Sequence, residues 1–201
     1  MHVFAHSIAQ KRAIGCAIRC KRDDIPAADG GIISIVVVLG PVSVNVEMRT
    51  DAPGSAEYAE EAWDLKEQIR KREGVLKQRR AFFVDAYRRA HDHLLFEEDE
   101  LVGFASVRRD GYILFLAVAP ERRGEGYGKR LVVAAVQDHE SITCHARATN
   151  DAALSFYDHL GFEIQRRISN YYEDGGDAYY LRLDDGDSRR LIDRISGFFR
   201  R

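Results

Sequence analysis

Residues 118–131 read VAPERRGEGYGKRL, and this is the most informative stretch of the chain. The apolar run of residues 112–119 stops at Pro120, and an apolar helical pattern begins after three glycines at alternate positions: Gly124, Gly126 and Gly128. Glycine lets successive backbone N–H groups point at one anion, and the start of a helix adds the positive end of its dipole. The neighbouring charges come from Arg122, Arg123 and Lys129. The stretch therefore predicts a strand-to-helix turn that binds phosphate groups.

The spacing of this turn separates it from other phosphate-binding motifs. From Arg123 to Gly128 it reads R-x-x-G-x-G, which fits neither the dinucleotide-binding fingerprint nor the P-loop. It resembles the pyrophosphate loop of the Gcn5-related N-acetyltransferases, in which Arg or Gln is followed at the third position by Gly and at the fifth by Gly or Ala. The resemblance implies that the turn binds the diphosphate of acetyl-coenzyme A. A glycine-rich turn without a ligand is the alternative.

A second segment resembles the next block of the same family. Residues 145–162 read HARATNDAALSFYDHLGF, which is a strand, an asparagine, a helix that carries a tyrosine, and then L-G-F. The two blocks stand in the family's order and at its spacing, and together they cover about half the chain. The resemblance implies an α/β (α+β) fold, the GNAT fold, with a mixed, mostly antiparallel sheet of about seven strands and helices on both faces.

Composition excludes several classes of protein. The chain has 201 residues, of which 45% are hydrophobic, so it is long enough for one domain with a full core. Thirty basic and 32 acidic residues give a formal charge of −2, so no nucleic-acid partner is expected. The odd count of three cysteines suits a reducing compartment, and we expect a cytoplasmic protein. Cys16 and Cys20, with His2 and His6 upstream, do not supply four ligands at zinc spacing, so no metal is expected.

The first 43 residues are predicted to be an N-terminal extension. Residues 1–31 have no sustained hydrophobic period, and the apolar run 32–39 is far shorter than the ~20 residues of a membrane-spanning helix. Acidic residues before the run disfavour a signal peptide; a signal anchor is the alternative, and no membrane partner is expected. Two interpretations stay open: a disordered extension, or translation from an over-extended start. The acetyltransferase domain is expected at residues 44–185.

Hydrophobic periodicity predicts the order strand, two helices, three strands, helix, strand, helix and two strands. The strands are predicted at residues 44–50, 94–96, 101–107, 112–118, 141–147, 163–172 and 178–183. The helices are predicted from apolar stripes at residues 59–69 and 76–90, from residues 126–137 and from residues 152–160. Charged residues of the first two helices are interpreted as a solvated face. Residues 186–201 form an amphipathic tail whose apolar face, containing Leu191, Ile192, Ile195, Phe198 and Phe199, is expected to dock on the domain or on a second subunit.

Two residues are candidates for proton transfer, because acetylation of an amine needs a base for the amine and an acid for the departing thiolate. By resemblance, Tyr157 is the acid; the alternative is a packing residue. His145 is the predicted base, since it occupies a slot that holds glutamate in ribosomal-protein alanine acetyltransferases and histidine in some eukaryotic N-terminal acetyltransferases. The alternative is a structural histidine. Cys144 faces the opposite side of the same strand, so a covalent acetyl-cysteine is not expected.

The resemblance also implies a set of residues that bind acetyl-coenzyme A. The strand before the turn is expected to pair with the pantetheine arm through Leu116, Ala117 and Val118. The turn is expected to bind the phosphates through Arg122, Arg123, Gly124, Gly126, Tyr127, Gly128 and Lys129. Asn150 and Tyr157 complete the set, and Asn150 is also a candidate helix N-cap.

The acceptor amine is the least determined part of the prediction. Residues 170–181 resemble the Y-Y-x-D-G-x-D-A segment of protein N-terminal acetyltransferases, which implies that Tyr171 and Tyr172 contact a peptide N-terminus. Tyr112 is a further candidate for the acceptor pocket, although its distance from Pro120 differs by one from that of the eukaryotic relatives. The helix pair at residues 56–91 lacks the short proline-containing loop of those enzymes. A small-amine acetyltransferase and a non-catalytic coenzyme A-binding module therefore stay open, as do a monomer and a homodimer.

Overall fold

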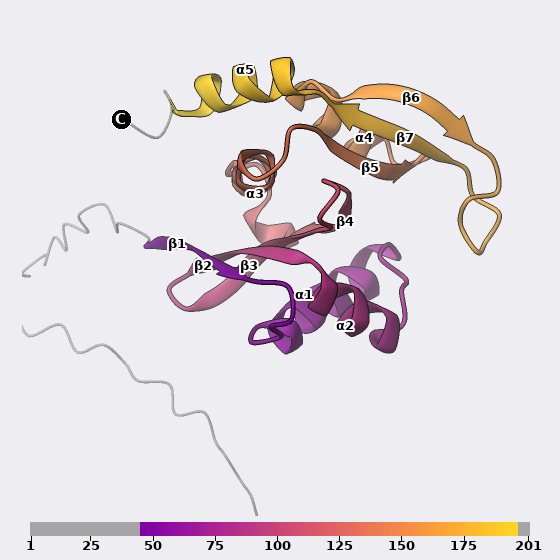
Figure 1. Cartoon of the computed structure of the whole chain (residues 1–201). Helices are drawn as coiled ribbons and strands as arrows, with labels where there is room; N and C mark the ends of the chain where they lie inside the picture. The colour runs from indigo at the N-terminus through magenta and orange to yellow at the C-terminus, as the bar shows by residue number, and fades with distance from the viewer. Residues whose placement is uncertain (1–44, 197–201) are drawn as a thin grey trace, which may run out of the picture. The chain divides into compact units, whose positions relative to one another are not determined.

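The computed structural model describes residues 45–196, so the predicted N-terminal extension lies outside the described residues. Its strands, labelled in Figure 1, are β1 (Val46–Asp51), β2 (His91–Glu97), β3 (Glu100–Val107), β4 (Ile113–Val118), β5 (Ile142–Arg147), β6 (Glu163–Ile168) and β7 (Ala178–Leu183). Its helices are α1 (Ala59–Glu73), α2 (Arg80–Arg89), α3 (Tyr127–Gln137), α4 (Asp151–Leu160) and α5 (Asp185–Ser196), with a short 3-10 turn at Pro120–Arg122. The predicted order of elements is confirmed up to β7.

The seven strands form two antiparallel sheets. The first has the order β1-β2-β3-β4, and the second has the order β5-β7-β6. Between β4 and β5 the described residues form one isolated parallel bridge, Tyr112 with Thr143, in which the Thr143 N–H donates to the Gly111 carbonyl at 3.0 Å. The fold class is confirmed, and the strands are divided four and three because β4 and β5 diverge beyond this bridge.

Gly111 is the residue on which the junction of the two sheets depends. It has φ +78°, and a Cβ built there would lie 2.2 Å from the Ser141 carbonyl oxygen. Gly111→Ala should therefore lower the free energy of unfolding by about 2–3 kcal/mol, the sum of backbone strain and steric overlap. Urea unfolding measures the loss. Gly74→Ala is the matched control, because Gly74 has φ +71° in open space; equal losses would show that the close approach at Gly111 is unimportant.

Helices cover both faces of the four-stranded sheet, as expected. Alternate residues of β2 point to opposite faces, so that Leu94 packs with α1 and α2 whereas Leu95 packs with α3. The face of the first sheet that is covered by α3 belongs to one apolar core. This core also contains residues of α3 and, from the second sheet, Ile142 and Leu181. Figure 1 shows α3 lying between the two sheets.

The first helix pair differs in part from its prediction. Gly74 ends α1 in the left-handed conformation, as predicted. Leu76 and Phe82 do not belong to the second apolar stripe: α2 begins only at Arg80, and Phe82 is 55% exposed because the buried stripe contains Phe83, Ala86 and Tyr87. The solvated-face interpretation is wrong at Lys66, which is fully buried. Its ammonium donates to the Gln78 carbonyl at 2.7 Å and lies over the Trp63 ring. The sequence pattern did not predict this buried hydrogen bond.

The C-terminal helix docks on the domain. Leu191 is 1% exposed, and Leu191 and Ile192 pack against the core that contains α3. Ile195, Phe198 and Phe199 lie outside the part whose side chains are described. Among residues 45–196, no helix is long and apolar enough to cross a membrane.

Candidate active site

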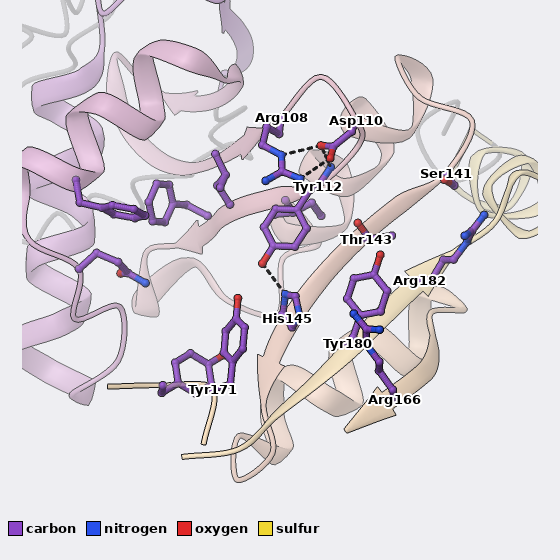
Figure 2. Close-up of a pocket in the computed structure, with 16 residues that line it drawn as sticks. Arg108, Asp110, Tyr112, Ser141, Thr143, His145, Arg166, Tyr171, Tyr180 and Arg182 are labelled. Atoms are coloured by element: carbon purple, nitrogen blue, oxygen red, sulfur yellow. Dashed lines mark hydrogen bonds and ion pairs between the residues drawn. The ribbon is translucent and has the colours of Figure 1, made fainter. Parts of the chain in front are cut away.

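A pocket of about 650 Å³ lies where β4 and β5 begin to diverge, and Figure 2 shows its lining. Tyr112 enters it from the start of β4, His145 from β5, and Tyr180 from β7. Tyr171 and Tyr172 close it from the loop between β6 and β7. The three predicted acceptor-binding tyrosines and the predicted base are therefore brought together, although up to 60 residues separate them in sequence.

His145 and Tyr112 form the central contact of the pocket. The Tyr112 hydroxyl and His145 Nδ1 are hydrogen-bonded at 2.7 Å, and Figure 2 shows the two side chains pointing at each other. Burial raises the pKa of the Tyr112 phenol far above its ordinary value, so this hydroxyl keeps its proton. Burial, and then the positive charge of Arg166, lower the pKa of His145 below 6.5. His145 is therefore a neutral imidazole near pH 7, able to accept a proton.

The Tyr171 ring forms one wall beside His145. It stacks on the imidazole with ring centroids 4.4 Å apart and an interplanar angle of 15°. Tyr172 packs edge-on against Tyr171, with ring centroids 5.1 Å apart, and the Arg147 guanidinium lies 4.1 Å from the centre of its ring. This loop is also held from outside, because Asp174 forms ion pairs with Arg147 at 3.0 Å and with Lys77 at 3.6 Å.

Tyr157 lies on the other side of β5. It belongs to the core that contains Cys144, is 8% exposed, and does not line the pocket. Cys144 shares this side with Ile142 and Ala146, which confirms the predicted alternation along the strand. Burial, with the nearby Cys144 thiol, raises the pKa of Tyr157 well above 10. The phenol is thus protonated at neutral pH, as a proton donor must be.

The predicted phosphate turn has the backbone geometry that anion binding needs. Gly124 and Gly126 both have φ +84°, and a Cβ at either would meet no atom within 4 Å. Gly126 is the N-cap of α3, and no side chain of the described part of the chain caps this helix, so its first N–H groups face the open space beside the glycines. Gly128 instead lies against the Phe156 ring, 3.1 Å from a built Cβ. The Tyr127 side chain is buried, so its main chain alone borders the turn.

Both arginines of the turn are held by carboxylates that sequence reasoning missed. Arg123 donates two hydrogen bonds to Glu73 at the end of α1, at 2.8 and 3.0 Å. Arg122 pairs with the buried Glu97, to which the Tyr127 hydroxyl also donates at 3.4 Å. The acids are 25 to 50 residues away in sequence, so no local pattern marks them. Their effect is to fix both guanidinium groups beside the glycine turn.

One backbone edge of β4 faces β5, from which it diverges after the Tyr112–Thr143 bridge. β4 pairs with β3 on one side only, with Leu116 opposite Ala105 and Val118 opposite Gly103, and the described residues form no ladder beyond the Tyr112–Thr143 bridge on the other. Leu116, Ala117 and Val118 therefore offer main-chain groups to an extended ligand. Asn150 caps α4 by accepting from the Ala153 N–H at 3.1 Å, which confirms that interpretation.

Curated proteins of similar sequence include two N-alpha-acetyltransferases. N-alpha-acetyltransferase 30 of Schizosaccharomyces pombe is 31% identical over 96 residues, which are 41% of this chain and 64% of that protein. N-alpha-acetyltransferase RimI of Mycobacterium tuberculosis is 33% identical over 97 residues, which are 43% of this chain and 61% of that protein. The chain thus spans less than two thirds of either relative.

The fold matches a solved structure along most of that structure's length. Ard1 from Thermoplasma volcanium has a TM-score of 0.58 and 24% identity, over 69% of this chain and 97% of that one. The model of the acetyltransferase (GNAT) family matches residues 52–162, which include both β4 and the phosphate turn. Since this match covers more than half of the chain, the protein belongs to the acetyltransferase (GNAT) family.

Proposed function

We propose that this protein transfers the acetyl group of acetyl-coenzyme A to a primary amine, and that the amine is the N-terminal α-amine of a protein or peptide. The observation that carries the proposal is the arrangement around the divergence of β4 and β5. A glycine turn with two fixed arginines lies at the end of β4, and a neutral histidine hydrogen-bonded to a tyrosine lies at its start. The names of the two relatives, both N-alpha-acetyltransferases, support the same activity.

The co-substrate would be held along β4 and the start of α3. The diphosphate fits the turn, where Gly124, Gly126 and the open N-terminus of α3 supply N–H groups and Arg122 and Arg123 supply charge. The pantetheine arm fits the free edge of β4 at residues 116–118. Gly128 lies close to the Val118 side chain on this path, Asn150 would hydrogen-bond the cofactor, and Lys129 adds a further positive charge. Acetyl-coenzyme A supplies an activated thioester, and no metal takes part in the proposed reaction.

The transfer needs three groups of the protein. The amine nitrogen attacks the acetyl carbonyl and forms the C–N bond, while His145 takes the proton that the nitrogen loses. Tyr112 holds the imidazole in place through its hydrogen bond. The C–S bond then breaks, and Tyr157 gives its proton to the departing thiolate. His145 and Tyr157 lie on opposite sides of β5, so acceptor and thioester approach the gap from opposite sides.

The charge of the pocket favours a peptide over a polycationic small amine. Arg108, Arg166 and Arg182 line it; Arg108 is paired with Asp110, the one carboxylate among the described lining residues, and Arg182 is paired with Asp184. The described lining therefore offers a polycation no unpaired carboxylate, while a peptide N-terminus carries a single positive charge that it loses before attack. The rings of Tyr171 and Tyr172 offer flat surfaces against which the first residues of the peptide can pack. The protonation chemistry of His145 and Tyr157 argues against a pure coenzyme A-binding module, which would need neither.

The acceptor class is tested by acetylation of a peptide library with free N-termini, in parallel with a panel of polyamines and aminoglycosides. We expect acetylation of peptides, and loss of the signal when the N-termini are blocked. Acetylation of small amines alone would show that the acceptor is a small metabolite and not a peptide. No turnover of either, with acetyl-coenzyme A bound, would favour the binding module.

The pH profile tests His145 as the base. Because the pKa of His145 is lowered, kcat at saturating peptide should fall only below pH 6.5, where the imidazole becomes protonated. Arg166→Gln removes a positive charge that disfavours the imidazolium, so the pKa of His145 should rise and the acid limb should move to higher pH. His145→Ala should flatten the limb.

The matched control is Arg182→Gln, which removes a guanidinium from the same pocket but one paired with Asp184. This variant should leave the acid limb in place. An acid limb unaltered in His145→Ala would assign the base to another group or to a water chain.

A further inference from the structure

Three side chains with metal-binding atoms meet at the junction of β2 and α3. His91 and His93 stand at the start of β2, and Asp138 follows the last residue of α3. One ligand atom from each lies within 4.8 Å of the others. We propose that His91, His93 and Asp138 bind a divalent transition-metal ion, with zinc as the metal that this donor set fits best.

The fold itself brings these residues together. Alternate residues of a strand share a face, so His91, His93 and Leu95 point to the same side of β2. Leu95 packs in the core that contains α3, so the two imidazoles continue that face toward the end of the helix. Their rings lie side by side, with centroids 4.8 Å apart and an angle of 38° between planes. α3 ends at Gln137, which places the Asp138 carboxylate over them.

The distances are close to those of a tetrahedral site. Asp138 Oδ2 lies 3.3 Å from His91 Nδ1 and 3.7 Å from His93 Nε2. Zinc binds imidazole nitrogen and carboxylate oxygen at about 2.0–2.2 Å, so two ligand atoms of a tetrahedral site stand roughly 3.3 Å apart. One pair already has this separation, the second pair is 3.7 Å apart, and all three ligand atoms lie within 4.8 Å of one another, so a bound ion would draw them together.

The environment of His93 is a second observation that favours an ion here. Its side chain is 4% exposed, and the buried Nε2 atom has no hydrogen-bond partner among residues 45–196. Buried polar atoms are nearly always bonded, and the 3.7 Å to Asp138 is too long for a hydrogen bond. An ion between the two would satisfy both atoms. The side chains of His91 and Asp138 are 35% and 44% exposed, which leaves an entry path and space for water as the fourth ligand.

The site is separate from the acetyl-transfer chemistry. None of its residues lines the acceptor pocket or belongs to the phosphate turn. A bound ion would instead join the first residues of β2 to the end of α3. Its expected effect is on the stability of the domain, and this inference does not depend on the proposed function.

The test is zinc titration of the full-length protein in a background with His2→Ala, His6→Ala, Cys16→Ser and Cys20→Ser, which removes the other histidine and cysteine cluster noted in the sequence. Calorimetry should show one Zn²⁺ per chain. At a free zinc concentration of about 100 Kd, Tm should rise by about 5 °C or more. Cobalt(II) in place of zinc should give the visible absorption of a tetrahedral site.

Asp138→Asn is the first variant, because the exposed side chain can be changed with little risk to folding; it should weaken zinc binding at least tenfold. His93→Ala should abolish binding. His159→Ala is the matched control, since it removes an imidazole from the surface of α4 and should change nothing. The proposal is overturned if Asp138→Asn and His93→Ala bind zinc as the background protein does, or if the background protein binds none.

Discussion

Arg123→Ala combined with Gly126→Asp is expected to weaken the binding of acetyl-coenzyme A by about 10³-fold or more, beyond detection in a calorimetric titration. The first change removes a guanidinium that the structure holds beside the turn through Glu73. The second places a carboxylate where the backbone has φ +84° and open space, at the N-terminus of α3. A charge-assisted hydrogen bond is lost and a negative charge is set against the diphosphate, so both changes act in the same direction.

Two controls separate this effect from damage to the fold. Gly54→Asp introduces the same side chain at another glycine of positive φ with open space around it, and it should keep the affinity of the parent protein. Glu73→Gln removes the carboxylate that holds Arg123 but keeps the guanidinium, so it should weaken the binding of acetyl-coenzyme A far less than the double variant does. Retained binding in the double variant would mean that the phosphates bind elsewhere, and the proposed function would lose its main support.

Tyr157→Phe should lower kcat by about 10²-fold or more while the affinity for acetyl-coenzyme A changes little. The variant keeps the ring that packs against Phe156 and Phe162, with centroids 5.2 and 5.0 Å away, so α4 should remain in place. It removes only the phenolic proton. The thiolate of coenzyme A, whose thiol form has a pKa of ~8.5, would then leave without a proton donor, and the barrier to breaking the C–S bond would rise.

Two control variants separate the effect of losing the Tyr157 hydroxyl from the effect of changing the side chains around it. Cys144→Ala removes the thiol beside the Tyr157 hydroxyl and should retain most of the turnover. Tyr179→Phe removes a hydroxyl from a half-buried tyrosine of β7, away from the acceptor pocket lining, and should also be nearly silent. Single-turnover kinetics would locate the defect of Tyr157→Phe in the chemical step. Unchanged single-turnover rates would leave Tyr157 as a packing residue.

Local patterns predicted most of the fold. The end of α1 at Gly74, the start of α3 after the glycines and the cap of α4 at Asn150 all follow from residues that lie within one turn of the feature they specify. The side of β5 that His145 faces followed from the alternation along a strand. In each case the interacting residues lie close together in sequence, so a local pattern is enough to predict the structure.

Contacts between distant segments were not predictable in the same way. Lys66 was assigned to a solvated face because no local pattern shows that its ammonium donates to the Gln78 carbonyl, twelve residues further along the chain. The ion pair of Arg123 with Glu73 and the hydrogen bond of Tyr112 with His145 likewise join residues 33 to 50 positions apart. The roles of His145, Tyr157 and the turn in binding and transfer stay predictions until the variants are measured.

The ion pair of Lys77 with Asp174 has a consequence for how an acceptor enters. Lys77 belongs to the connection between α1 and α2, and Asp174 to the loop that carries Tyr171 and Tyr172, so the pair latches one rim of the pocket to the other. Both side chains are well exposed, and such pairs are weak and screened by salt. The latch is therefore easy to open, and association with an acceptor should become faster as ionic strength rises, the reverse of a steered encounter.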